Sequence, residues 1–339
     1  MLDAKQAPAP DYIFQILNAY QQTAALKAAI ELDVFTAIGE GNRTSNKISE
    51  RCGASERGMR ILCDYLVVYG LLTKKNAGYD LTPTTATFLN KRSPAYMGTV
   101  AQFLTSEDLR EGFRELRGAV QKGGTVIAEN VLETENPMWI TFARSMVPLM
   151  MPAAEEIAEL TGATKGEKWK VLDIAAGHGM FGITIALKNQ NAEIVALDWP
   201  GILAVAQENA DKAGLGSRFR KLPGSALDVE FGADYDLVLI TNFLHHFDKA
   251  TCEKLLGKVY RALKPGGRAV TLEFVPNEDR VSPPVSATFS LVMLAETPSG
   301  DAYTFAEYQS IFEKAGFSRN ELHFLKQSPE QVIISEKAS

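Results

Sequence analysis

The chain has 339 residues, of which 46% are hydrophobic and 22% charged, a balance typical of a water-soluble protein with room for two domains. Its formal net charge of −6 does not favour nucleic-acid binding by the chain as a whole. The three cysteines lie far apart in the sequence, which indicates neither a disulfide framework nor a zinc site.

The first ten residues are rich in Ala and Pro and contain no apolar signal core, so we expect a loose tail. No apolar run in the chain approaches the roughly 18 residues that a membrane span needs. We therefore expect a cytoplasmic protein that does not contact a membrane.

The N-terminal third predicts helices at 12–30, 44–50 and 56–69 and a small hairpin over 71–82. Helices followed by a hairpin are the pattern of a winged helix, which can bind DNA. Helix 56–69, however, is apolar on most of its circumference, which suits burial better than a major groove. We expect residues 1–93 to be a domain that packs or dimerises, with helix 12–30 as a candidate dimer face.

Residues 94–160 predict a mainly helical connector. Within it, Trp139, Phe142 and Met146 fall on one face of the segment 138–150. Such a stripe is more often core than ligand-binding surface. Because it lies immediately before the next domain, it is also a candidate wall of a ligand pocket.

Strands and helices alternate over residues 161–339, which predicts an α/β fold with a doubly wound, largely parallel sheet. Only residues 326–330 separate the last two strands, too few for a parallel crossover, so these strands must pair antiparallel. The predicted strands are 170–174, 193–197, 217–222, 235–240, 267–274, 321–325 and 331–335.

A small-residue turn follows the strand at 170–174, and a helical pattern follows the turn. In it, Gly177, Gly179 and Gly182 have Gly-x-Gly-x-x-Gly spacing, which taken alone is shared with NAD and FAD proteins. Glycines let a ligand approach the backbone, and the helix start offers unpaired N–H groups. The segment therefore predicts a nucleotide-binding turn.

Two carboxylates narrow the choice of ligand. Asp173 lies inside the strand just before the turn, where it would attract an ammonium group and repel a pyrophosphate. Asp198 ends the next strand about 20 residues after the glycines, where it suits hydrogen bonds to ribose hydroxyls. The antiparallel pair at the end of the chain further disfavours a nicotinamide oxidoreductase.

The sequence resembles the class I S-adenosylmethionine-dependent methyltransferases, and within them the two-domain small-molecule O-methyltransferases of plants and bacteria. The blocks that support the resemblance are Val-Leu-Asp-Ile-Ala-Ala-Gly-His-Gly, Ala-Leu-Asp-Trp-Pro, Tyr-Asp-Leu-Val-Leu and Leu-Lys-Pro-Gly-Gly. The resemblance implies a Rossmann-like domain with seven strands and an antiparallel last strand at 161–339. It also implies an N-terminal α-helical winged-helix dimerisation domain, a homodimer, and S-adenosylmethionine as methyl donor, with S-adenosylhomocysteine as product.

The resemblance assigns most contacts with the methyl donor to two places in the chain. Asp173, Ala175, Gly177 and Gly179 would line its methionine part, and Asp198 would bind its ribose.

Further contacts with the methyl donor follow from the resemblance, with two departures. Trp199 would lie beside the adenine. The family often has an acid after the third strand, where this chain has Ser225 followed by Ala226. Plant members have a lysine where this chain has Thr241, which is followed by Asn242.

The stretch 241–248 lies just past the carboxyl end of the fourth strand, where open α/β sheets place their ligands. Histidine is the side chain suited to deprotonate a phenol near neutral pH. The family pattern places the general base at His245, although the adjacent His246 could exchange roles with it. It also matches Glu273 with the acid that orients this base.

A second orienting acid of plant members falls at Ala302, so either the neighbouring Asp301 replaces it or the dyad acts alone. A metal site of His245, His246 and Asp248 is disfavoured, because the spacing fits no common ligand set. We expect no metal.

An apolar acceptor pocket is predicted from side chains in three separate parts of the chain. Phe289 and Met293 lie on a predicted helix that follows the last long strand, and Phe243 precedes the histidines. Together with Phe142 and Met146 they favour an aromatic or polyketide-like acceptor.

These expectations add up to an O-methyltransferase that acts on a small molecule and binds no nucleic acid. Three alternatives remain: C- or N-methylation on the same fold, a relative that binds the methyl donor without transferring methyl, and a winged-helix DNA-binding regulator.

Overall fold

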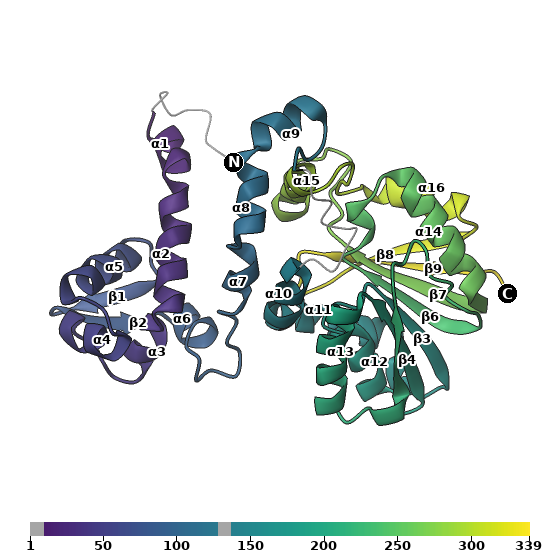
Figure 1. The fold of residues 1–339 in the computed structure, drawn as a ribbon, viewed down its shortest axis with the longest axis horizontal. Helices are drawn as coiled ribbons and strands as arrows, with labels where there is room; N and C mark the ends of the chain where they lie inside the picture. Colours follow the sequence, from purple (N-terminus) through teal and green to yellow (C-terminus); the bar gives the residue numbers. More distant parts are fainter. Residues whose placement is uncertain (1–9, 128–136) are drawn as a thin grey trace. The chain divides into compact units, whose positions relative to one another are not determined.

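The computed structural model describes residues 10–127 and 137–339 (Figure 1). The chain divides into two compact units, Met1–Thr105 and Ser106–Ser339. The tail expected at residues 1–10 lies almost wholly outside the described residues. The division of the chain at residues 93 and 160 stays a prediction.

The first unit contains the helices and the hairpin that the sequence predicts. The helix expected over 12–30 is divided at Asn18, whose side-chain amide donates to the carbonyl of Phe14. Strands β1 and β2 pair antiparallel. The elements are α1 (Asp11–Leu17), α2 (Ala19–Glu31), α3 (Val34–Gly39), α4 (Ser45–Cys52), α5 (Glu56–Val68), β1 (Leu72–Lys75), β2 (Gly78–Leu81), α6 (Pro83–Phe88) and α7 (Val100–Leu104).

Helix α5 begins at a capping residue and buries one stripe. The Ser55 hydroxyl accepts from the Gly58 N–H, which satisfies one of the free donors at the helix start. Only Met59, Cys63 and Leu66 are fully buried, at the i, i+4, i+7 spacing of an amphipathic helix. The helix is therefore less completely buried than its composition suggests.

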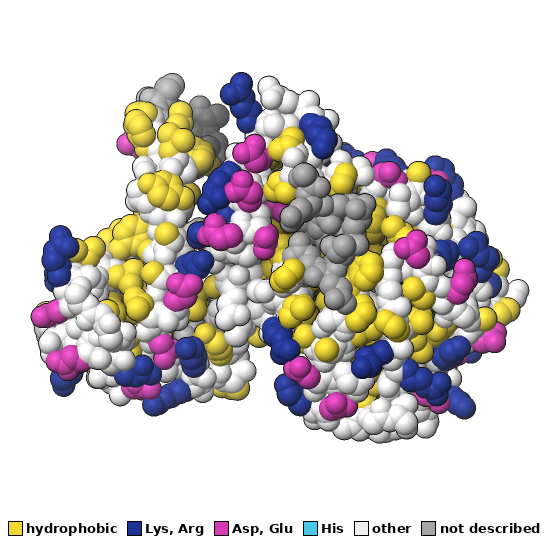
Figure 2. Space-filling view, in the orientation of Figure 1, with side chains coloured by type: hydrophobic (Ala, Val, Ile, Leu, Met, Phe, Trp, Pro, Cys, Tyr) yellow, Lys and Arg dark blue, Asp and Glu magenta, His cyan; other side chains and the backbone are white. Residues whose placement is uncertain are grey.

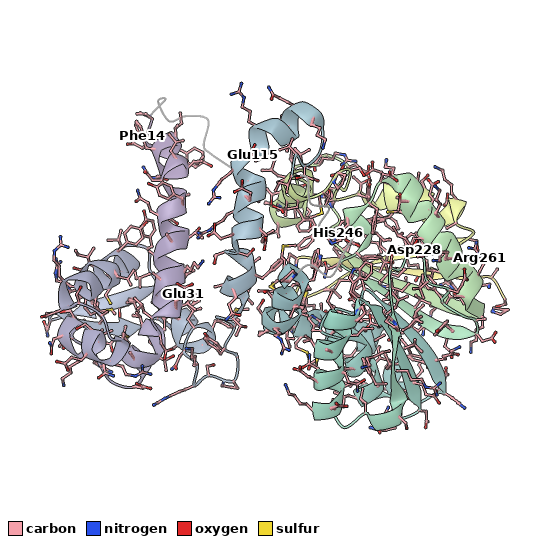
Figure 3. All side chains as sticks on the ribbon, in the orientation of Figure 1. Phe14, Glu31, Glu115, Asp228, His246 and Arg261 are labelled. Carbon is pink, nitrogen blue, oxygen red and sulfur yellow. The ribbon has the colours of Figure 1, made fainter. Side chains whose placement is uncertain are left out.

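Helix α1 has no buried residue. Hydrophobic side chains gather along it in the space-filling view (Figure 2). Phe14 is labelled on it in Figure 3. A row of large apolar side chains exposed in this way is typical of a surface that another chain covers. The exposed apolar residues of α1 and the start of α2 are Tyr12, Ile13, Phe14, Ile16, Leu17 and Tyr20.

The second unit opens with helices and continues into the sheet. No described helix of the chain is long and apolar enough to cross a membrane. The opening helices are α8 (Glu107–Arg114), α9 (Leu116–Lys122), α10 (Pro137–Ser145) and α11 (Val147–Leu160).

A seven-stranded sheet in the order β5-β4-β3-β6-β7-β9-β8 forms the centre of this unit. Strand β9 is antiparallel to both its neighbours, β7 and β8, and the other pairings are parallel. The predicted doubly wound sheet with an antiparallel last strand is confirmed. The strands are β3 (Trp169–Ile174), β4 (Ala192–Asp198), β5 (Phe219–Pro223), β6 (Tyr235–Thr241), β7 (Leu263–Glu273), β8 (Arg319–Phe324) and β9 (Gln331–Glu336).

Helices cover both faces of this sheet (Figure 1). The central strands β3 and β6 are buried along nearly their whole length, as expected of parallel strands covered on both sides. Their carboxyl ends, with those of β4 and β7, meet at one edge, which we call the carboxyl edge. The covering helices are α12 (Met180–Lys188), α13 (Pro200–Lys212), α14 (Lys249–Ala262) and α16 (Phe305–Lys314), whereas α15 (Pro284–Glu296) packs against α8 and α9.

Candidate active site

Asp173, in β3, is a fully buried carboxylate that is only half satisfied. Its Oδ2 accepts from the Gly182 N–H at 3.0 Å, while its Oδ1 has no hydrogen-bond partner. A Cβ on Gly182 would lie 2.9 Å from that Oδ2, so a glycine is needed for the helix to pack against the carboxylate. Burial raises the pKa of Asp173 to about 7. The free oxygen can therefore accept from a donor that the described residues do not supply.

The turn after β3 is built from residues in the left-handed region. Ala175 has a φ of 52° and Gly177 one of 57°. This conformation is costly for alanine and common at ligand-binding turns. The Gly177 N–H donates to Asp198 Oδ2 at 2.8 Å, and the Trp199 N–H donates to Asp198 Oδ1 at 2.7 Å. The turn and the end of β4 are thereby fixed to each other.

Asp198 keeps capacity for further donors. Burial raises its pKa to about 6, although two N–H bonds act in the opposite direction. Each carboxylate oxygen has two lone pairs, and only one per oxygen is engaged. Ribose hydroxyls fit the remaining lone pairs, and an ammonium group fits the free Oδ1 of Asp173. These residues can therefore hold the amine and the ribose of S-adenosylmethionine.

The other residues predicted to contact the methyl donor already make contacts within the chain. The Ser225 hydroxyl accepts from the Leu227 N–H at 3.1 Å, so part of its hydrogen-bonding capacity serves its own turn. Ala226 belongs to the hydrophobic core beside the sheet. Trp199 packs against a small apolar cluster that includes Ile202 and Val205. The roles of these residues stay predictions.

The carboxyl end of β6 presents two more of the predicted residues. Thr241 is buried there, and Asn242 follows with a φ of 53°. The Asn242 side-chain amide lies 3.6 Å from the Met150 sulfur. These two polar side chains lie at the same carboxyl edge as Asp173.

His245 and Glu273 form a buried pair at this edge. His245 Nδ1 lies 2.5 Å from Glu273 Oε2, and both side chains are almost completely shielded from solvent. Glu273 Oε1 accepts from the N–H groups of Phe243 and Leu244 at 3.1 and 2.8 Å. One carboxylate thus orients the ring and also holds the turn before it. Because Nδ1 faces the carboxylate, Nε2 is the nitrogen that can act on a ligand.

Backbone contacts fix His245 from the other side. The Asp301 N–H donates to the His245 carbonyl at 3.0 Å. A Cβ on Gly300 would lie 2.2 Å from that carbonyl, so the close approach requires glycine. The Asp301 carboxylate points instead to Arg280, at 3.4 Å. The structure therefore does not bring the Asp301 carboxylate to His245 in place of the missing acid at Ala302.

His246 has a different environment. Its ring lies 4.3 Å from that of His245 and 5.5 Å from that of Trp139, between centroids. Burial, and secondarily the charge of His245, lowers its pKa well below the usual value. Its Nδ1 has no hydrogen-bond partner in the part of the chain that the structure describes. Lacking a carboxylate to stabilise its protonated form, His246 is less suited to be the base. Figure 3 labels His246 near the end of the sheet at which α10 and α15 lie.

His178, inside the glycine turn, serves the backbone. Its Nδ1 accepts from the Met180 N–H at 3.1 Å, and its ring stacks on Phe142. Burial lowers its pKa to about 4, so it stays neutral at physiological pH. A structural role for His178 agrees with this geometry.

Most of the predicted pocket side chains contact the site. The Phe289 ring lies 4.9 Å from that of His245, and Phe142 contacts the glycine turn beside Gly177. The Phe243 ring lies 6.5 Å from that of His246. Met146 on the α10–α11 junction and Met293 on α15 are buried.

Sequence reasoning missed several residues here. Phe274 stacks on Phe289 at 4.1 Å and directly follows Glu273, so its strand position could have revealed it. Met150, Gly300 and Glu330 come from distant parts of the chain and had no local pattern to mark them. Among residues 10–127 and 137–339, no three His, Cys, Asp or Glu side chains gather as metal ligands would.

Comparison with known proteins places both units in one family. Residues 166–318 match the family model of the O-methyltransferase domain, and residues 14–91 match that of the O-methyltransferase dimerisation domain. A solved structure of a candidate O-methyltransferase from Nostoc punctiforme is similar with a TM-score of 0.94. It is 51% identical, and the alignment covers 98% of this chain and 100% of that one.

Two curated relatives extend the comparison. The 3-hydroxy-5-methyl-1-naphthoate 3-O-methyltransferase of Streptomyces sahachiroi is 25% identical over 97% of this chain and 96% of its own length. The L-tyrosine C(3)-methyltransferase of Streptomyces lavendulae is 27% identical over 92% of this chain and 88% of its own. With the fold, the glycine turn and the two matched domains, these similarities show that the chain belongs to the two-domain O-methyltransferases, within the class I S-adenosylmethionine-dependent methyltransferases.

Proposed function

We propose that this protein transfers a methyl group from S-adenosylmethionine to a hydroxyl of a small aromatic or polyketide-like molecule, with His245 as general base and Glu273 as its orienting acid. The observation that supports this most is the buried His245–Glu273 pair at the same carboxyl edge as the half-satisfied Asp173.

The methyl donor would be held by residues of the β3 and β4 ends. The free Oδ1 of Asp173 takes the ammonium group, and Asp198 takes the ribose hydroxyls. Phe142 and Trp199 provide apolar surface near the turn and near the expected adenine, respectively. When bound, S-adenosylmethionine supplies a methyl group that its sulfonium already activates. The chain's task is therefore to align the acceptor oxygen and to remove its proton.

His245 is the group placed to remove that proton. A phenol has a pKa near 10 and is a weak nucleophile while protonated. Nε2 accepts the phenolic proton, and the Glu273 carboxylate at Nδ1 stabilises the imidazolium that results. The rings of Phe289 and Phe243 exclude water around the histidines and suit a flat apolar acceptor.

Methylation of carbon is the second candidate. The Streptomyces lavendulae relative is named as a C-methyltransferase, so this fold supports both outcomes. A base beside the acceptor hydroxyl serves either reaction, because a phenolate is nucleophilic at oxygen and at the neighbouring ring carbon. The His245–Glu273 pair alone therefore does not distinguish them.

The attached atom can be determined directly. The full-length protein is incubated with S-adenosylmethionine carrying a ¹³C-labelled methyl group and a panel of naphthols, phenols and hydroxylated polyketides. We expect a labelled product whose methyl carbon has the chemical shift of a methyl ether. A labelled methyl group on a ring carbon and none on oxygen would contradict O-methylation.

We further propose that the protein is a homodimer formed through its N-terminal domain, which matches the dimerisation family model. The double variant Ile13→Lys, Leu17→Lys places two charges on the exposed apolar row of α1. We expect light scattering to change from dimer to monomer mass, because a buried unpaired charge costs several kcal/mol. Val281→Lys, at an exposed apolar residue of the second unit, is the control. A dimer mass in the double variant would contradict this interface.

A further inference from the structure

Glu330 is a buried carboxylate that the proposed reaction does not use. It lies just before β9 with 4% of its surface exposed. Its Oε2 accepts from the Ser328 hydroxyl at 2.8 Å, whereas its Oε1 is within hydrogen-bonding distance and geometry of no donor among residues 10–127 and 137–339. In the described part of the chain, no lysine or arginine forms an ion pair with it.

The register of the sheet places Glu330 at the carboxyl edge. Gln331 pairs with Glu273 across β9 and β7, so Glu330 is one residue from the strand position opposite the orienting acid. The charges of Glu273 and His245 both act on Glu330, and the Asn242 side-chain amide interacts with its carboxylate as a hydrogen-bond donor. Asn242 also reaches Met150 of α11, so these groups surround one region.

The two carboxylates of this region differ in their partners. Glu273 Oε2 lies 2.5 Å from the His245 ring nitrogen, whereas no basic side chain among the described residues pairs with Glu330. Burial raises the pKa of Glu330, which is the response of a carboxylate that lacks compensation. A buried carboxylate with a free oxygen is stabilised most by a donor, and best by a cationic one. The described residues supply neutral donors but no cationic one, so a ligand is the natural source of a cation.

We propose that Glu330 is a specificity-determining residue that binds a hydrogen-bond donor of the methyl acceptor, an ammonium group above all. The acceptor class is then a phenol with a basic nitrogen on a short side arm. This inference rests on the proposed methyl transfer, since it assigns a second anchor to the same acceptor.

A purely structural role for Glu330 predicts a different outcome. If its carboxylate held the β8–β9 loop, the isosteric Glu330→Gln would destabilise the protein at every pH. Under our proposal the ionised carboxylate destabilises the folded protein in the absence of ligand. Glu330→Gln should then melt at or above the wild-type temperature at pH 8, where the uncompensated charge is present.

The test uses two probes that differ by one charged group. Full-length protein is first saturated with S-adenosylhomocysteine, so that Asp173 is engaged and does not compete for amines. Tyramine and 4-ethylphenol are then titrated by calorimetry into wild type, Glu330→Gln and Glu336→Gln. Glu336 lies at the far end of the same strand and is partly exposed, so it is a matched control.

We expect wild type and Glu336→Gln to bind tyramine at least tenfold more tightly than 4-ethylphenol, and Glu330→Gln to bind the two about equally. No preference in wild type, including no measurable binding of either probe, would overturn the proposal, as would a preference that Glu330→Gln retains. Should Glu330→Gln not fold, the ratio of the wild-type affinities for tyramine and 4-ethylphenol decides alone. Failure of wild type to bind S-adenosylhomocysteine in the first step would refute the proposed function itself.

Discussion

Replacing His245 by alanine is expected to lower kcat by about 10²- to 10⁴-fold while the affinity for S-adenosylhomocysteine stays within twofold of wild type. The loss has this size because general-base catalysis contributes about that factor. The affinity is kept because His245 pairs with Glu273 and not with the predicted residues for the methyl donor. Steady-state transfer of labelled methyl to the acceptor found in the panel measures kcat, and calorimetry measures the affinity.

The pH dependence separates a base from a structural residue. A phenol ionises without help near pH 10, so the deficit of His245→Ala should shrink as the pH rises from 7 to 10. A merely distorted site would keep its deficit at all pH values. His246→Ala is the matched control, because its ring is adjacent but has no carboxylate partner. If His246→Ala lost the activity and His245→Ala kept it, the assignment of the base would be reversed.

Asp173→Asn is expected to weaken binding of S-adenosylhomocysteine by about 10- to 100-fold and at the same time to stabilise the free protein. The first effect follows because a charge-assisted hydrogen bond to the ligand's ammonium group contributes about 1.5–3 kcal/mol. The second follows from the burial of a carboxylate with one unsatisfied oxygen. At pH 8 the gain in the free energy of unfolding should be about 1–3 kcal/mol, less than the roughly 4 that the raised pKa implies at most.

The sign of the pH effect provides a second check. The folded-state pKa of Asp173, about 7, is above its ordinary value of 3.8. The protonated group therefore stabilises the free protein fully below about pH 4, and that stability is lost as the pH rises through 7. In Asp173→Asn the free energy of unfolding should no longer fall between about pH 4 and 7 on account of this group. Asp198, with a pKa raised to about 6, adds a similar loss that the variant keeps.

Binding of the methyl donor should depend on pH in the opposite sense. The ligand's ammonium group needs the ionised carboxylate, so wild-type affinity should increase as the pH rises towards and through 7. Thermal melts and calorimetric titrations from pH 5 to 8 measure both effects. Asp228→Asn, at an exposed carboxylate, is the control for loss of a negative charge. A variant that binds like wild type would contradict the role of Asp173.

Much of the fold was predictable because its determinants are local. The buried run at β3, the glycine turn and the next helix are adjacent in sequence. The connection at 326–330 is too short for a parallel crossover, so the last two strands could pair only antiparallel. The division of the first helix at Asn18 was not predictable, because the apolar periodicity continues through it. The partial exposure of α5 was missed for a related reason: composition shows which side chains are apolar but not how many neighbours cover them.

The candidate site was predictable where a motif surrounds the residue and not elsewhere. Asp173 and Asp198 lie at the ends of strands that the pattern identifies, and the histidines follow the end of another. Glu273 could be matched only by resemblance, yet its three hydrogen bonds explain why a carboxylate is needed there. Glu330 reaches the same region through the antiparallel return of β9, a contact that depends on the whole sheet. No local pattern could reveal it.

We infer above all that the carboxyl edge of this sheet binds the methyl donor through Asp173. Calorimetric titration of the full-length protein with S-adenosylhomocysteine at pH 8, alongside Asp173→Asn, tests it most directly. We predict one binding event per chain in wild type and at least tenfold weaker binding in the variant. Absence of binding by wild type, or equal affinity in the two proteins, would show that Asp173 does not bind the methyl donor.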